Sequence, residues 1–94
     1  SLETMEVNAA SEGRLVVRIR LEELEEEEKP ETIRVLAARY DGGKMTALDM
    51  VETTAEGLFL LTLPDGSGVT YRVFLLDGGQ SSPLCPAVSP ETAP

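Results

Sequence analysis

Histidine and tryptophan do not occur in this sequence of 94 residues, and cysteine occurs once, as Cys85. Without an imidazole the chain cannot form a Ser-His-Asp or Cys-His catalytic set, and the same count excludes a zinc site made of cysteine and histidine ligands. Cys85 has no partner for an internal disulfide, and its proline neighbours offer no base that would activate the thiol. We therefore predict no catalytic residues, no cofactor-binding residues and no metal ligands, and we expect that the protein is not an enzyme.

Aromatic residues are also few. The chain has four of them: Tyr40, Phe59, Tyr71 and Phe74. Cleavage of a glycosidic bond by paired carboxylates would need a concave site with aromatic platforms, for which a chain of this size has little room. A carbohydrate-binding sandwich would use exposed rings, whereas all four rings here fall in apolar strand patterns where we expect the core to take them. Tyr71 opens the pattern Tyr71-x-Val73-x-Leu75, a placement typical of a tyrosine corner, whose hydroxyl bonds to the backbone.

No apolar run approaches the ~18 residues needed to cross a bilayer, so we expect no membrane insertion. The 8 basic and 17 acidic residues give a formal net charge of −9. Such a charge repels phosphate groups and argues against nucleic acid or an anionic membrane as a partner. The excess of acidic residues is well explained by solubility.

A sharper interpretation is that the acidic loops meet a basic partner or bind Ca²⁺, which takes carboxylate and carbonyl oxygens as ligands. The candidates are the glutamate-rich run at 22–28 and the turn residues Asp41, Asp65 and Asp77. However, the sequence has no Asp-x-Asp-x-Asp-Gly loop, and an Asp-Gly pair is also what a plain turn uses. We favour the turn interpretation and predict no metal ligands.

The apolar runs alternate as β-strands do, and glycine and proline fall between them. In residues 15–21, for example, Leu15, Val17 and Ile19 alternate with Val16 and Arg18. We predict seven short strands, at 5–8, 15–21, 33–40, 44–51, 58–63, 71–76 and 84–88. Short strands with turn signals about every 8–12 residues indicate two packed sheets. The predicted fold class is all-β, an immunoglobulin-like antiparallel β-sandwich.

Two segments depart from simple alternation. The pattern slips at Val35-Leu36, where a β-bulge would explain it. Residues 21–29 are rich in helix-forming glutamate and leucine, but nine residues are too few for a stable free helix. Like charges four residues apart, such as Glu22 and Glu26, would also repel. We predict the end of a strand followed by a solvated loop with at most one helical turn. The domain is expected to span 1–88, and 89–94 to form a tail or linker.

Residues 29–88, about two-thirds of the chain, resemble a known group of modules. The stretches that carry the resemblance are Lys-Pro-Glu-Thr-Ile at 29–33, Tyr-Asp-Gly-Gly-Lys-Met at 40–45, Leu-Pro at 63–64, Tyr-Arg-Val-Phe-Leu-Leu-Asp at 71–77 and Pro-Leu at 83–84. In order and spacing they are similar to immunoglobulin- or fibronectin-III-like modules of secreted and surface proteins of gut Firmicutes and related bacteria. Leu76 stands where that family commonly has tryptophan. The resemblance implies the fold and an extracellular setting, and it implies no ligand.

We therefore expect a non-catalytic structural or spacer module of a larger extracellular or cell-surface bacterial protein. Its partners would be neighbouring domains of the same polypeptide, and the module itself would be a monomer. The sequence starts with Ser-Leu-Glu and not with methionine, so we expect a piece of a longer protein whose targeting signal lies elsewhere. The alternative is a protein- or carbohydrate-binding adhesion module that acts through loops at one end of the sandwich or through an edge strand.

Overall fold

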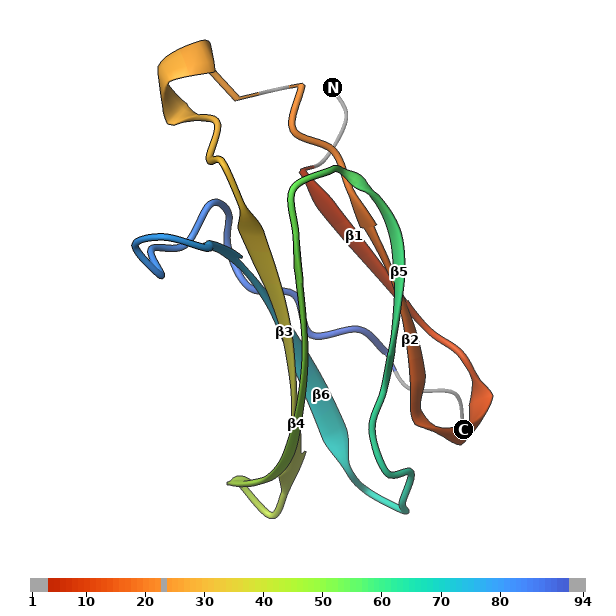
Figure 1. The fold of residues 1–94 in the computed structure, drawn as a ribbon. Helices are drawn as coiled ribbons and strands as arrows, with labels where there is room; N and C mark the ends of the chain where they lie inside the picture. The colour runs from red at the N-terminus through yellow and green to blue at the C-terminus, as the bar shows by residue number, and fades with distance from the viewer. Residues whose placement is uncertain (1–3, 23, 92–94) are drawn as a thin grey trace.

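Two antiparallel sheets face each other in the computed structural model, which describes residues 4–22 and 24–91 (Figure 1). The strands are β1 (Met5–Ala9), β2 (Arg14–Ile19), β3 (Ile33–Asp41), β4 (Lys44–Thr53), β5 (Gly57–Thr62) and β6 (Thr70–Asp77). One sheet has the strand order β1-β2-β5 and the other has the order β4-β3-β6. The predicted all-β sandwich is confirmed, and the described residues form six strands in place of the seven expected.

The core lies between the two sheets and is almost entirely aliphatic. On β2, Leu15, Val17 and Ile19 are buried while the residues between them are exposed, as the alternation predicts. The side chains that are most completely buried come from both sheets: Leu15, Val17, Ile19, Ile33, Val35, Leu61, Val73 and Leu75. Burial of each such side chain contributes about 1.5–3 kcal/mol, so this layer is what holds the sheets together.

The seventh strand, predicted at 84–88, is replaced by two isolated bridges to β6. Val73 pairs with Val88, and Leu76 pairs with Pro83. Between the bridges β6 advances three residues while the facing segment advances five, so a regular ladder cannot form. Pro83 and Pro86 also lack the amide hydrogen that a strand would donate. The prediction of a strand is therefore wrong, although the segment does lie along the edge of β6.

The irregularity predicted at Val35-Leu36 is also misplaced. The register between β3 and β4 shifts between Arg39 and Tyr40 instead. At the predicted position β3 is regular, with Val35 fully buried and Leu36 half-buried on the opposite face. Apolar residues follow one another here because this part of the sheet is apolar on its outer face as well as on its inner one.

In the glutamate-rich connection between β2 and β3, the described residues form a loop with one 3-10 turn, at Glu26–Glu28. The prediction of at most one helical turn is confirmed, although β2 ends at Ile19 and not at Leu21. Beyond the strand, the amide of Leu21 donates a hydrogen bond to the Glu56 carboxylate at 2.6 Å. This bond joins the β2–β3 loop to the β4–β5 loop at one end of the sandwich.

The molecule is elongated, with principal extents of 42 × 25 × 18 Å. The strands run nearly along the long direction in Figure 1. β1 starts at the end of the sandwich that carries the β2–β3 loop, whereas the described chain after residue 88 crosses the sandwich nearer its middle. The two ends of the described chain are therefore separated along the strands.

Tyr71 forms the predicted tyrosine corner. Its ring is buried, and its hydroxyl donates a hydrogen bond to the carbonyl oxygen of Pro64 at 3.1 Å. The same carbonyl accepts a bond from Nε of Arg39 at 2.7 Å. Burial raises the pKa of the Tyr71 hydroxyl, and the nearby Asp65 carboxylate raises it further.

Replacement of Tyr71 by phenylalanine is expected to lower the free energy of unfolding by about 1 kcal/mol, because one hydrogen bond is lost while Arg39 still satisfies the carbonyl. The wild type should also lose stability above about pH 10, since a raised pKa in the folded state favours the neutral hydroxyl there. Urea unfolding at pH 8 and pH 11 measures both effects. If the stability difference between wild type and Y71F were the same at both pH values, the titration of Tyr71 would not contribute to folding.

Candidate functional site

The outer face of the β4-β3-β6 sheet carries a continuous group of apolar side chains. The strand register places Met50, Leu36 and Phe74 in one row across the three strands. Residues directly opposite each other lie on the same face of a sheet. The adjacent row contains Leu48, and Met45 lies opposite Tyr40 further along. We name Leu36, Met45, Leu48, Met50 and Phe74 the apolar face.

Three members of the apolar face are large, exposed and close together on one edge strand. Met45 is 55% exposed, Leu48 is 52% exposed and Met50 is 50% exposed, and all three lie on β4. Single exposed apolar residues are normal on a protein surface, whereas a contiguous group with a polar border is typical of an interaction site. The arrangement is therefore suited to contact with another apolar surface.

Polar groups border the apolar face. At one end, Arg34 on β3 makes an ion pair with Glu52 on β4 at 3.2 Å and also donates to the carbonyl of Gly78. Beside the central row, the Arg72 guanidinium lies over the Phe74 ring, 5.6 Å from its centre. An apolar centre with a polar rim is the usual composition of a protein–protein interface.

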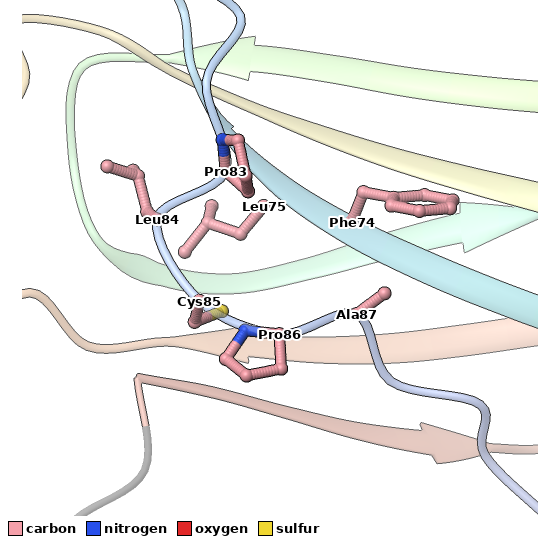
Figure 2. Close-up of a pocket in the computed structure, with 7 residues that line it drawn as sticks. All are labelled: Phe74, Leu75, Pro83, Leu84, Cys85, Pro86 and Ala87. Atoms are coloured by element: carbon pink, nitrogen blue, oxygen red, sulfur yellow. The ribbon is translucent and has the colours of Figure 1, made fainter.

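Phe74 also lines an open hollow of about 470 Å³ between β6 and the following segment (Figure 2). The hollow lies where that segment departs from β6 between its two bridges, and its remaining lining residues are Leu75, Pro83, Leu84, Cys85, Pro86 and Ala87. Cys85 is half-buried, and burial raises the pKa of its thiol. A thiol with a raised pKa is a poor nucleophile, so the hollow offers apolar contact and no evident chemistry.

Two of the four aromatic residues do not lie where the sequence predicted. Tyr71 is buried, and Phe59 packs against the core. Tyr40 and Phe74 instead lie half-exposed on the outer face of the β4-β3-β6 sheet. The expectation that the core takes all four rings is wrong because β3 and β6 contain runs, at 35–38 and 73–76, that are apolar on both faces, and alternation alone does not identify the inner one.

The acidic candidates for Ca²⁺ that the structure describes are not brought together; Glu23, in the run at 22–28, lies outside the described residues. Asp65 accepts a hydrogen bond from the amide of Gly66, and Asp77 accepts bonds from the amides of Gly79 and Gln80. These are the bonds with which aspartate stabilises a turn. Within residues 4–22 and 24–91, no group of three or more Asp, Glu, His or Cys side chains is arranged to hold a metal ion.

Asp49 occupies a special position that the sequence did not reveal. One of its carboxylate oxygens accepts the amide of Met50 on β4 at 2.9 Å, and the other accepts the amide of Thr62 on β5 at 3.0 Å. β4 and β5 are edge strands of different sheets. The carboxylate therefore bridges the two edges at the side of the sandwich. An inward-pointing charge at an edge is a known protection against unwanted strand pairing.

These features define the chain as a small two-sheet antiparallel β-sandwich. One of its sheets has an apolar outer face, and the Asp49 carboxylate joins the edge strands β4 and β5. No family model, no curated protein and no solved structure matches it. In the part of the chain that the structure describes, no helix combines the length and the apolar character needed to cross a membrane.

Proposed function

We propose that this chain is a non-catalytic accessory module of a larger extracellular or cell-surface protein, and that it packs against a neighbouring protein domain through the apolar face. The observation that carries the proposal is the cluster of Met45, Leu48 and Met50, each at least half exposed on β4. Their burial would remove apolar area from water, which is the main driving force of protein association.

Several further features support a protein partner in preference to a glycan. A sugar ring would need an accessible aromatic platform, but Arg72 covers one side of the Phe74 ring. Methionine side chains are flexible and polarisable, and they suit contact with irregular apolar surfaces. The resemblance to immunoglobulin- and fibronectin-III-like modules supports an accessory role, and the separation of the chain ends along the strands is favourable for a spacer.

The three methionines provide a direct test of the apolar face. Met45 and Met50 are exposed, whereas Met5 is 3% exposed in the core and serves as an internal control. Methyl-labelled methionine would be observed by NMR with a soluble paramagnetic agent, first in the isolated module and then in the intact gene product. We expect the agent to broaden the Met45 and Met50 signals in the module and to leave them largely unaffected in the intact protein.

A matched pair of variants makes the test specific. Leu48→Glu places a charge on the apolar face, and Leu58→Glu places the same charge at a similarly exposed position on the other sheet. In the intact protein, L48E should restore broadening of Met45 and Met50, and L58E should not. Equal broadening of both methionines in the isolated module and in the intact protein would contradict the proposal.

A further inference from the structure

A second surface, on the opposite sheet, combines exposed leucines with a strand edge. It comprises Val16 and Arg18 on β2 and Leu58 and Leu60 on β5, and we name it the β5 edge patch. Leu58 is 58% exposed and Leu60 is 59% exposed. Val16 lies opposite Leu60, and Arg18 lies opposite Leu58, so the four side chains share one face of the sheet.

Among the described residues, no strand pairs with the outer edge of β5 beside these leucines. The amide of Leu63 donates a hydrogen bond to the carbonyl oxygen of Gly13, directly before β2. The amides of every second residue back along β5 therefore also point toward β2. Because amides alternate along an antiparallel strand, those of Leu58, Leu60 and Thr62 face the edge. The amide of Thr62 already donates a hydrogen bond to the Asp49 carboxylate. The part of the edge that remains open is therefore the part that carries the two exposed leucines.

The charge of this surface is opposite to that of the whole chain. Arg18 lies on the patch, although the chain carries a net charge of −9, and Arg14, two residues before Val16 on the same face of β2, is in an ion pair with Glu12 at 3.9 Å. Glu6 lies opposite Arg18 on β1, but its carboxylate forms an ion pair with Arg20. No ion pair of Arg18 occurs among the described residues. Arg18 thus offers a cationic group beside the apolar leucines.

We propose that the β5 edge patch binds an acidic protein segment in an extended conformation, which adds to β5 as a further strand. Main-chain hydrogen bonds would supply affinity, and alternate side chains would supply specificity, as in other cases of strand addition. Neighbouring strands lie about 4.8 Å apart, so the added strand would lie two such spacings from β2, on the far side of β5. The long Arg18 side chain can reach across Leu58 to a carboxylate on the outer face of that strand. The inner positions would face the Asp49 carboxylate, which repels further carboxylates, so the acidic residues of the segment belong on its outer face.

This binding is separate from packing through the apolar face, because the two surfaces lie on different sheets. The probe is a fluorescein-labelled eight-residue peptide of alternating glutamate and valine, with the valine nitrogens methylated. N-methylation on one side blocks stacking of the peptide on itself and leaves the other side free to pair with β5. The first control peptide replaces glutamate by lysine. The second is methylated at every nitrogen, so neither of its sides can form a ladder.

We expect the glutamate peptide to bind at least about tenfold more tightly than the lysine peptide. Binding should weaken severalfold between 50 and 500 mM salt, because salt screens exposed charges. Arg18→Glu should reverse the preference between the two peptides. Arg72→Glu makes the same change of charge on the other sheet and should leave the preference unchanged. The fully methylated peptide should not bind.

NMR locates the contact and separates it from the apolar face. The amide signals of Leu58 and Leu60 should shift on addition of the glutamate peptide, while the methyl signals of Met45 and Met50 should not. Equal affinity for the two charged peptides, or shifts confined to residues outside β5 and β2, would overturn the proposal. A dimer that forms without peptide and is lost in Leu60→Lys would also overturn it and would assign the edge to a second copy of the chain.

Discussion

Replacement of Gly13 by alanine should lower the free energy of unfolding by more than about 3 kcal/mol. Gly13 lies in the turn between β1 and β2, where it is buried with a φ of +73°, and an added Cβ would lie 1.8 Å from the carbonyl oxygen of Leu63. The two backbones cannot separate easily, because the amide of Leu63 donates to the carbonyl of Gly13 at 2.9 Å. The variant must break this contact or distort the start of the β2–β5 pairing.

Gly68 provides a closely matched control for this prediction. Its φ is +76°, nearly the same as that of Gly13, but an added Cβ would meet nothing within 4 Å. Gly68→Ala should therefore show the conformational cost alone, about 1–2 kcal/mol. Urea unfolding followed by far-UV circular dichroism compares the two variants. Equal midpoints would mean that the close approach of Gly13 to Leu63 does not matter for stability.

Replacement of Asp49 by alanine is the second substitution with a large expected effect. It removes the acceptor of two amides on different sheets, and hydrogen bonds to a charged group are stronger than neutral ones. We expect a loss of about 2 kcal/mol in the free energy of unfolding. The open amides of β4 and β5 should also increase self-association, because unpaired edges are templates for pairing with another chain.

Urea unfolding and sedimentation velocity measure the two consequences of Asp49→Ala. Asp65→Ala is the control, since Asp65 bonds to its adjacent amide in a loop and joins no strands. It should cost less stability and leave the protein monomeric. A monomeric D49A protein with wild-type stability would show that the bridge across the two edges has no protective role.

The sheets were predictable wherever one face of a strand is apolar and the other polar. β2 is the clearest case, because Leu15, Val17 and Ile19 alternate with Arg14 and Arg18, and a single assignment of faces is possible. The turn at 42–43 and the tyrosine corner of Tyr71 were also predictable, since both depend on local chemistry. Each of these features depends on residues that lie close together in the sequence.

The rest depends on neighbours that the sequence does not identify. Leu36 and Phe74 lie in runs that are apolar on both faces, so alternation could not place them outside the core. The segment at 83–88 has strand-like residues, but its register with β6 slips by two residues between the bridges. The role of Asp49 cannot be recognised from the sequence, because it depends on β4 and β5 being neighbouring edge strands of different sheets.

The separation of the chain ends along the strands has a mechanical consequence. Tension applied between the start of β1 and the segment after Val88 would act nearly parallel to the strands. The hydrogen bonds of an antiparallel pair lie perpendicular to that direction. The bonds between β1 and β2 would therefore be loaded in shear and would share the force, whereas a pull across the sheet would open them one at a time. At the other end the same force would act on the two isolated bridges that join residues 83–88 to β6, so this attachment should yield before the β1–β2 pairing.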